Sequence, residues 1–363
     1  MRRFLQIILL RPVLWAAKKF SGRPDKNRIF NALSALLLHV TKHPGKRGII
    51  VPFRLEDGKF IILSDQHKGK RNGADDFALS EKNYLAALQY YAGNDYWYIN
   101  LGDSEELWEN SLGQVKKKNR EAFAAEKLFI RNNRYIKVFG NHDLYWDNDP
   151  LAGWQLKDIY GEKIKVYEAV LLKTFAGHSP LTIFLTHGHQ GDAQSDGNWF
   201  SKFFVANIWA PLQSFLRINP NTPAYDADRK TLHNKLMYEW SSAQPDLLLI
   251  TGHTHQPVFA SLTHLERLYR QYNLAAKSGN KERMAELEKE LTKRSKVAAG
   301  VPSDRDTIQP VYFNTGCCCF SDGDITGIEI AEGKIRLIKW EMTETTSKRI
   351  ILEETDLIDL LQQ

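Results

Sequence analysis

Two histidines stand one residue apart directly after an aliphatic run, in the stretch LITGHTHQP over residues 249–257. Residues two apart on a strand point to the same face, and in the turn that follows a strand both side chains can converge on one point. A single histidine would be unremarkable. His253 and His255 behind a glycine could together bind a metal ion, provided that the rest of the chain supplies further ligands.

Four other stretches also place metal-binding side chains directly after a predicted strand. They are LSDQHKG, LGDSEEL, FGNHDL and LTHGHQGD, and they contain Asp65, His67, Asp103, Asn141, His142 and His187. In open α/β sheets, ligands bind beyond the carboxyl ends of the strands. Five strand ends, near residues 63, 101, 139, 186 and 251, therefore carry carboxylate, amide and imidazole groups to one edge. This donor set suits Mn²⁺, Fe or Zn²⁺.

Strands and helices must alternate to position these side chains, and the hydrophobic pattern predicts that they do. Strands are expected before each of the five motifs, and helices over 79–92, 117–132, 198–217 and 226–242. The stretch GIIVPFRLEDGKFIILSD is typical of a β-hairpin that turns at Asp57-Gly58. The charged segment 262–298 predicts an inserted helical hairpin that is broken at Ser278-Gly279-Asn280. The fold class is therefore α/β.

In this order the motifs resemble those of the calcineurin-like metallophosphoesterases, whose pattern is D-x-H, G-D, G-N-H-D/E, H and G-H-x-H. The resemblance covers residues from about 59 to 340. It implies a β-sandwich flanked by helices, and a dinuclear metal centre. One ion would be held by Asp65, His67 and His255, the other by Asn141, His187 and His253, and Asp103 would bridge them. Manganese is the expected metal, with Fe or Zn²⁺ as alternatives.

Two cations about 3.5–4 Å apart suit in-line displacement at phosphorus, because they activate a water molecule and neutralise phosphate oxygens. In the family pattern the residue at His142 binds no metal but protonates the leaving oxygen or stabilises the phosphoryl charge. Its acidic partner would be Glu106, which could otherwise be an acid at a helix start. We expect Asp143 to orient the loop. His189 is a candidate substrate contact, with a surface or supporting histidine as the alternative.

The stretch LGDSEELWEN resembles the Gly-Asp-x-x-Glu-x-Trp motif of the UDP-2,3-diacylglucosamine hydrolases, which cleave a pyrophosphate in a lipid A precursor at the membrane face. Residues 198–242 lie where those enzymes carry a helical lid, and Trp199 and Phe203 would contact acyl chains there. The alternative is a core helix packed on the sheet. Those hydrolases commonly have Arg at the position of His142. A general phosphodiesterase, a phosphoprotein phosphatase, a nuclease and a non-catalytic scaffold therefore stay as alternatives.

The charge of the chain is concentrated at its beginning. The 363 residues carry a net charge of +6, and residues 1–50 alone hold eleven Lys or Arg against one acid. Basic residues interleaved with Leu, Ile, Phe and Trp suit a helix in the membrane interface, so we expect the basic amphipathic arm 1–47 to meet an anionic membrane. The alternative is amphipathic helices packed on the body. Few aromatic residues are available for stacking, which makes nucleic acid a less favoured partner.

The sequence thus predicts three parts: the arm 1–47, a domain over 48–345 and a C-terminal tail over 346–363. No small-residue cleavage site follows the arm. The three cysteines, Cys317, Cys318 and Cys319, are adjacent and form no disulfide framework, so we expect small buried side chains in a reducing compartment. The expected location is cytoplasmic, peripheral on the inner face of the membrane.

Overall fold

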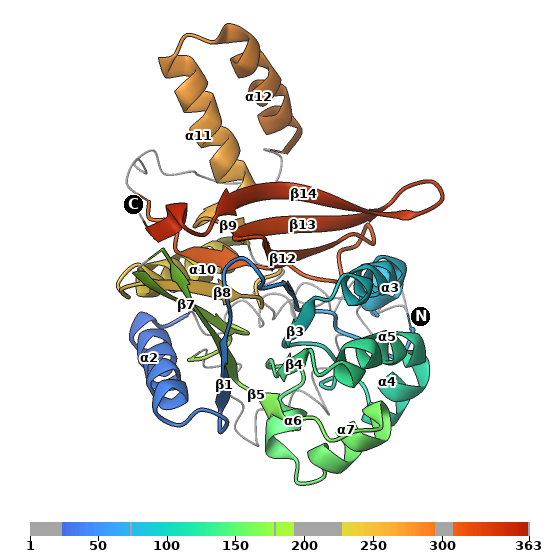
Figure 1. Cartoon of the computed structure of the whole chain (residues 1–363). Helices are drawn as coiled ribbons and strands as arrows, with labels where there is room; N and C mark the ends of the chain where they lie inside the picture. Colours follow the sequence, from blue (N-terminus) through green and yellow to red (C-terminus); the bar gives the residue numbers. More distant parts are fainter. Residues whose placement is uncertain (1–23, 73–74, 178, 192–226, 295–307, 362–363) are drawn as a thin grey trace, which may run out of the picture.

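The computed structural model describes residues 24–72, 75–177, 179–191, 227–294 and 308–361. Two seven-stranded sheets pack face to face and helices cover their outer sides (Figure 1). The α/β sandwich that the sequence predicts is confirmed.

The first sheet has the strand order β1-β6-β7-β8-β11-β9-β10. Its strands are β1 (Gly48–Pro52), β6 (Ala169–Ala176), β7 (Ser179–Thr186), β8 (Leu247–Thr251), β9 (Val258–Phe259), β10 (Leu262–Thr263) and β11 (Tyr312–Asn314). β1 runs parallel to β6, and β8 runs parallel to both β7 and β11. β7 and β8 therefore end at the same edge.

The second sheet has the strand order β14-β13-β12-β2-β3-β4-β5. Its strands are β2 (Phe60–Leu63), β3 (Trp97–Leu101), β4 (Tyr135–Val138), β5 (Val166–Tyr167), β12 (Ile325–Ala331), β13 (Lys334–Met342) and β14 (Ser347–Asp356). Strands β2 to β5 are parallel neighbours, so their carboxyl ends also share an edge. Strands β12 to β14 are antiparallel.

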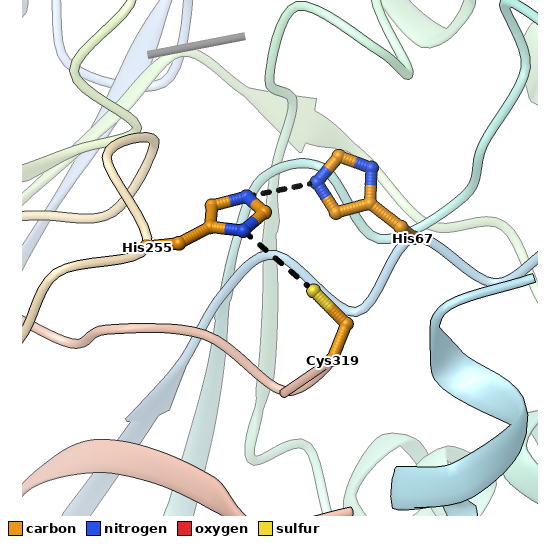
Figure 2. Close-up of side chains that lie close together, drawn as sticks. All are labelled: His67, His255 and Cys319. Carbon is orange, nitrogen blue, oxygen red and sulfur yellow. Dashed lines mark hydrogen bonds between the residues drawn. The ribbon is translucent and has the colours of Figure 1, made fainter. Parts of the chain in front are cut away.

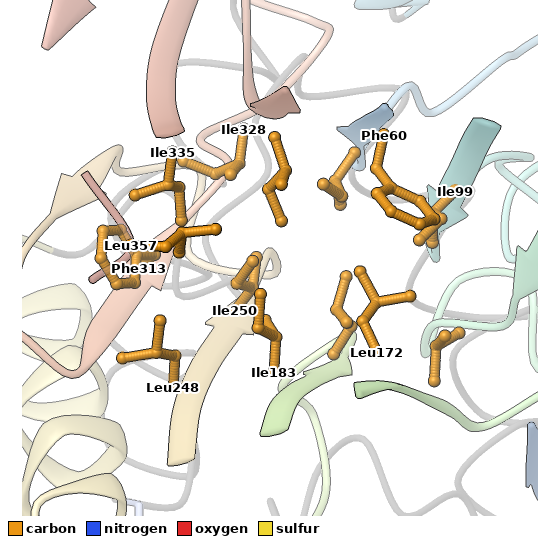
Figure 3. Packing of buried hydrophobic residues seen from close by; sticks show 14 of the residues in the cluster. Phe60, Ile99, Leu172, Ile183, Leu248, Ile250, Phe313, Ile328, Ile335 and Leu357 are labelled. Atoms are coloured by element: carbon orange, nitrogen blue, oxygen red, sulfur yellow. The ribbon is translucent and has the colours of Figure 1, made fainter. Parts of the chain in front are cut away.

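Alternating side chains of the strands build the core between the sheets. In β3, Ile99 points to the facing sheet and Tyr98 to the helices outside. In β6, Leu172 points inward while Leu171 packs with the helices on the other side. This is the period of two expected of strands covered on both faces. Figure 3 shows Ile99 and Leu172, from the two sheets, in the same cluster.

Helices cover the outer face of each sheet. α2 (Lys26–Lys42) and α10 (Ala227–Ser241) pack on the first sheet, and α3 (Phe77–Gly93) and α5 (Arg120–Arg131) pack on the second. Four shorter helices lie within the described residues: α4 (Leu112–Lys118), α6 (Tyr145–Asn148), α7 (Ala152–Tyr160) and η4 (Asp359–Leu361).

The predicted hairpin at Asp57-Gly58 is wrong. A turn does form there, with the Gly58 amide donating to the Arg54 carbonyl at 2.9 Å. However, β1 pairs with β6 in the first sheet and β2 pairs with β3 and β12 in the second. A short polar turn between two apolar strands looks the same in sequence whether the strands pair or cross between facing sheets.

The prediction of a membrane-facing arm over residues 1–47 is also corrected for the part of the arm that the structure describes. Asp25 caps α2, its carboxylate accepting from the Arg28 amide at 2.8 Å. The apolar stripe of α2 is fully buried against the first sheet and α10; its residues are Ile29, Leu33, Leu36 and Val40. This stripe belongs to the core and does not face a membrane, as in the alternative of helices packed on the body. Residues 1–23 lie outside the described residues.

The expected tail is part of the second sheet. β14 pairs with β13 along its whole length, from Met342 opposite Ser347 to Lys334 opposite Asp356, and forms an edge strand. The half-exposed pattern of an edge strand resembles that of a loop, so its sequence carries a weak signal.

The predicted helical hairpin is formed by α11 (His264–Lys277) and α12 (Lys281–Arg294), which lie beside each other above β14 (Figure 1). Its helices pack through Leu268 and Leu287, and Arg267 Nε pairs with Glu353 of β14 at 2.7 Å.

The expected lid is tested only in its second half. Residues 192–226, with Trp199 and Phe203, lie outside the described residues. The helix expected over 226–242 is α10, and its Leu236, Met237 and Trp240 are buried on the first sheet. α10 is therefore a core helix and not a lid. Within the described part of the chain, no helix combines the length and the apolar character needed to cross a membrane.

Candidate metal centre

The predicted ligands follow strand ends in both sheets. β2, β3 and β4 end in the second sheet before Asp65, Asp103 and Asn141, while β7 and β8 end in the first sheet before His187 and the histidine pair. The prediction of one edge of a single sheet is therefore corrected to two facing edges. The parallel runs in each sheet bring both sets of strand ends to the same side of the sandwich.

The backbone of these turns is unusual. Asp65, His67, Asp103, His253 and His255 all have φ between 50° and 69°. L-residues with side chains adopt this left-handed region at a cost, and such residues cluster at functional sites where the surrounding structure imposes them. Five of the seven expected ligands therefore occupy a conformation that their own sequence does not favour.

Asp65, His67 and His255 form the first half of the centre. His255 Nε2 lies 3.2 Å from Asp65 Oδ1 and 3.2 Å from His67 Nε2. Asp103 Oδ2 lies 3.7 Å from His67 Nε2 and 3.1 Å from His187 Nε2. The carboxylate of Asp103 thus touches both halves, as a bridging ligand must.

The expected second half comprises Asn141, His187 and His253. Ligand atoms of Asp103, His187 and His253 lie within 4.8 Å of one another. Asn141 Oδ1 is buried and makes no hydrogen bond. Because a buried polar atom without a partner is costly, this oxygen fits a metal ligand. The donor types and this orphan oxygen together fit two divalent cations.

Backbone amides hold the two carboxylates in place. The His253 amide donates to Asp65 Oδ2 at 3.0 Å, and the His142 amide donates to Asp103 Oδ1 at 2.8 Å. A Cβ atom at Gly252 would overlap Asp65 Oδ2, which explains why the motif needs glycine there. Asp143 accepts from the Gly140 amide at 2.6 Å and the Ser104 amide at 2.9 Å, so it orients its loop as expected.

The centre is electrostatically suited to cations. Burial favours the neutral carboxyl group, but the nearby imidazoles outweigh it and hold the pKa of Asp65 and Asp103 well below the ordinary range. Burial also disfavours charged imidazole, yet the carboxylates raise the pKa of His187 and His255 to about 9. In contrast, burial and neighbouring imidazoles keep the pKa of His253 well below its ordinary value.

Glu106 and His142 are brought together beside the first half. Glu106 Oε2 lies 2.7 Å from His142 Nδ1 and 2.9 Å from His67 Nδ1. Burial raises the pKa of Glu106, but the imidazoles of His142 and His67 lower it to about 2. The next helix begins only at Leu112, so the alternative of a helix-start acid is wrong. The reaction role of this pair stays a prediction.

Trp108 is a contact that sequence reasoning missed. Its indole stacks on the His142 imidazole, with ring centroids 4.1 Å apart and an interplanar angle of 20°. The sequence signal was the tryptophan of the Gly-Asp-x-x-Glu-x-Trp motif, two residues after Glu106.

His189 packs beside the centre. It is buried, and its ring lies 5.4 Å from that of His187. Burial and the His187 imidazole lower its pKa to about 3, so it is neutral. Its role in substrate binding stays a prediction.

The cysteines are buried as predicted, and the sulfur of one of them lies beside a predicted ligand. Cys319 Sγ lies 3.7 Å from His255 Nδ1 (Figure 2). Cys319 follows β11, the parallel neighbour of β8, so the fold brings together residues 64 positions apart in sequence.

Three overlapping groups of the described residues could hold an ion. They are Asp103–His187–His253, His67–Asp103–His142 and His67–His255–Cys319. The first matches the expected second half. The other two add His142 and Cys319 to the expected ligands. More side chains therefore lie within binding distance of an ion than the sequence indicated.

Comparisons with known proteins agree with these motifs. The family model of the calcineurin-like phosphoesterases matches residues 58–257, more than half of the chain. No curated protein matches the chain. Similar solved structures include a vacuolar protein sorting 29 from Cryptosporidium parvum, with 12% identity, TM-score 0.31 and coverage of 83% of this chain and 99% of that chain. Another is a dimetal phosphatase from Danio rerio, with 9% identity, TM-score 0.33 and coverage of 82% and 100%.

TM-scores this low carry no conclusion about activity, so the assignment depends on the family model and on the motif residues that it covers. All seven expected ligands, from Asp65 to His255, lie inside the matched range. The chain therefore belongs to the calcineurin-like phosphoesterase family.

Proposed function

We propose that the chain is a phosphoester hydrolase that uses two divalent metal ions, with Mn²⁺ as the first candidate. The observation that carries this proposal is the clustering of six of the seven family ligands, together with the buried, unpartnered Oδ1 of the seventh, Asn141. A scaffold has no need for buried ionised carboxylates, for strained turns or for an orphan amide oxygen. The same features argue against a non-catalytic role.

The residues of this chain have separable roles in the proposed reaction. Asp65, His67 and His255 would hold one ion, Asn141, His187 and His253 the other, and Asp103 both. When bound, the two ions supply Lewis acidity and an activated water molecule.

Glu106 faces His142 Nδ1 at 2.7 Å, which leaves His142 Nε2 to deliver a proton to the leaving oxygen. Trp108, stacked on the same imidazole, limits its rotation and keeps water from that face.

The proposed substrate is a nucleotide-lipid pyrophosphate or another phosphodiester at a membrane surface. The motif LGDSEELWEN supports it, and so do the six Lys or Arg and no acid of residues 1–23. A general phosphodiesterase and a phosphoprotein phosphatase are the alternatives. We place the protein on the cytoplasmic face of the membrane, because basic segments are attracted to its anionic lipids.

The reaction is tested by loading the metal-free chain with Mn²⁺ and assaying three substrates in parallel. These are a nucleoside-diphosphate lipid, bis-p-nitrophenyl phosphate and a phosphopeptide. We expect turnover of the first two and preference for the lipid. The same assay is run on Asp103→Asn, which changes the shared ligand, and on Asp57→Asn as its matched control. Asp57 is exposed and distant from the centre. Two bound ions without turnover of any of the three would refute the proposal, and preference for the phosphopeptide would select the phosphatase.

Membrane binding is tested separately by deleting residues 1–23 and leaving α2 intact. We expect the shortened chain to hydrolyse the soluble diester at the same rate and to lose most of its binding to vesicles of anionic lipid. Equal vesicle binding by both chains would disprove a membrane role of residues 1–23.

A further inference from the structure

His67, His187 and His255 share one arrangement. In each, Nε2 faces the carboxylates of the centre, and Nδ1 contacts a group outside it. The Nδ1 partner is Glu106 Oε2 at 2.9 Å for His67 and the Leu101 carbonyl at 2.9 Å for His187. For His255, Cys319 Sγ lies 3.7 Å from Nδ1, within hydrogen-bonding range for sulfur (Figure 2), and the Cys317 thiol also interacts with this imidazole.

The partner on Nδ1 decides which nitrogen can bind a metal ion. A neutral imidazole has one N–H and one lone pair, so an acceptor that holds the hydrogen at Nδ1 leaves the lone pair on Nε2. Groups behind metal-binding histidines commonly do this and thereby fix both the tautomer and the direction of the ring. Carboxylate and carbonyl oxygens are the usual groups, and a cysteine sulfur is an unusual one.

The position of Cys319 is fixed by the ligand loops themselves. The Cys318 amide donates to the Asp65 carbonyl at 3.1 Å, and the Thr315 amide donates to the Thr251 carbonyl at 2.9 Å. Asn314 Nδ2 donates to the Gly252 carbonyl at 2.6 Å. The turn that carries the cysteines is therefore tied to the loops of both Asp65 and His255.

The neighbouring cysteine has a different environment. Cys318 is fully buried in the hydrophobic cluster under α3, and its sulfur faces the Thr326 carbonyl at 4.0 Å. Loss of its side chain should reduce packing without touching a ligand. Cys318 is therefore a matched control for Cys319.

We propose that Cys319 is a positioning residue of the metal centre, whose sulfur accepts the Nδ1–H of His255 and so directs Nε2 to the ion of the first half. This role of Cys319 adds to the proposed function and depends on it only for the identity of the metal ligands. Direct binding of the ion by Cys319 is the competing arrangement, because His67, His255 and Cys319 also lie close enough together to share one.

The test measures metal affinity by calorimetry on the full metal-free chain, with Mn²⁺ and Zn²⁺, for the parent, Cys319→Ala, Cys319→Ser and Cys318→Ala. Loss of a partner behind a metal-binding histidine typically weakens binding by about 10–100-fold, so we expect that loss for one of two ions in Cys319→Ala. The serine hydroxyl can still accept a hydrogen bond, so Cys319→Ser should recover part of the affinity that Cys319→Ala loses. Cys318→Ala should melt at a lower temperature than the parent and bind both ions as the parent does.

Three outcomes would overturn the proposal. The first is unchanged affinity in Cys319→Ala, and the second is the same affinity loss in Cys318→Ala. The third is a sulfur-to-metal charge-transfer band in the Co²⁺-loaded parent that Cys319→Ala lacks, which would make Cys319 a ligand. ¹⁵N spectra of the Zn²⁺-loaded parent should show a proton on Nδ1 of His255. If the parent binds two ions and hydrolyses nothing, the proposed function fails while these affinities still decide the role of Cys319.

Discussion

The two halves of the metal centre differ in the charge around them. The first half contains the Asp65 carboxylate, and a second carboxylate, Glu106, contacts His67 from behind. The second half contributes the neutral amide of Asn141, and His253 is held neutral by burial and by neighbouring imidazoles. The carboxylate nearest to His187 of this half is the shared Asp103 at 3.1 Å, whereas Asp65 Oδ1 lies 4.0 Å away.

This difference predicts that the halves do not bind cations equally. An ion in the first half is attracted by a carboxylate of its own as well as by Asp103. An ion in the second half must share Asp103 with a neighbouring cation that repels it. We therefore expect the first half to fill first and the second to exchange more easily.

The largest effect is expected for Asp103→Asn, because this change removes the one charge that both halves share. A bound metal ion contributes several kcal/mol of stabilisation to a phosphoryl transition state. Since 1.36 kcal/mol corresponds to a factor of ten, the hydrolysis rate should fall by about 10³–10⁴-fold. Metal analysis should find at least one ion lost. Full activity with two bound ions would disprove the assignment of the bridge.

His142→Ala should have the next largest effect. General acid catalysis by one side chain is typically worth about 10²–10⁴-fold, and only a poor leaving group needs the proton. We expect a loss of about 10²–10³-fold on an alkyl phosphoester and a much smaller loss on a p-nitrophenyl ester.

The metal content of this variant is the decisive control. His142 also lies within ligand distance of His67 and Asp103. Loss of an ion in His142→Ala would make it a ligand of the first half. Equal losses on both esters with both ions retained would leave it a role in charge stabilisation only.

The motif residues could be predicted because each one follows a strand whose apolar run is visible in the sequence. The rule that carboxyl ends of parallel strands meet at one edge brings Asp65, Asp103 and Asn141 together, and the family resemblance implied their roles as ligands. The assignment of β1 and β2 failed at Asp57-Gly58, because sequence does not distinguish a hairpin from a crossing between facing sheets. For α2, the same apolar stripe suits a membrane or a sheet, and tertiary packing decides between them.

Trp108 and Cys319 could not be predicted, because their contacts depend on geometry and not on local pattern. Trp108 reaches His142 only because β3 and β4 are parallel neighbours, and Cys319 reaches His255 only because β11 lies beside β8. The left-handed backbone of Asp65 and His67 carries only a weak sequence signal, since neither residue is a glycine.

A pair of ligand variants should compare the two halves directly. Asp65→Asn removes the carboxylate that is expected to bind only the ion of the first half, whereas Asn141→Ala removes the neutral amide ligand of the second half. We expect Asp65→Asn to weaken binding of the tighter ion by about 100-fold, the upper end of what partners behind ligands contribute, and Asn141→Ala to leave the tighter ion bound. Titration of Mn²⁺ into both metal-free variants checks this. Retention of the tighter ion in Asp65→Asn would mean that the second half, and not the first, binds its ion more tightly.

The smallest effect expected is a difference in pH dependence between the halves. The pKa of His67 lies well above the ordinary 6.5, and that of His255 is about 9; in both cases nearby carboxylates outweigh burial. In the second half His187 has a pKa of about 9, while the pKa of His253 is lowered. A metal ion binds only neutral imidazole, so at neutral pH the first half must release protons from both His67 and His255, and the second half from His187 alone.

Each proton released makes the affinity rise about tenfold per pH unit until the pKa is reached. Between pH 7 and 9 the affinity of the first half should thus rise more steeply, by about one further factor of ten per unit. In contrast to the metal affinity, the stability of the metal-free fold should decrease as the pH rises. A histidine whose pKa is raised on folding stabilises the fold below its ordinary pKa near 6.5, and this contribution is lost as the pH rises through about 9. Calorimetry in two buffers of different ionisation enthalpy counts the protons released per ion. Equal counts for the two ions would mean that the halves carry the same charge, and the proposed order of filling would then be wrong.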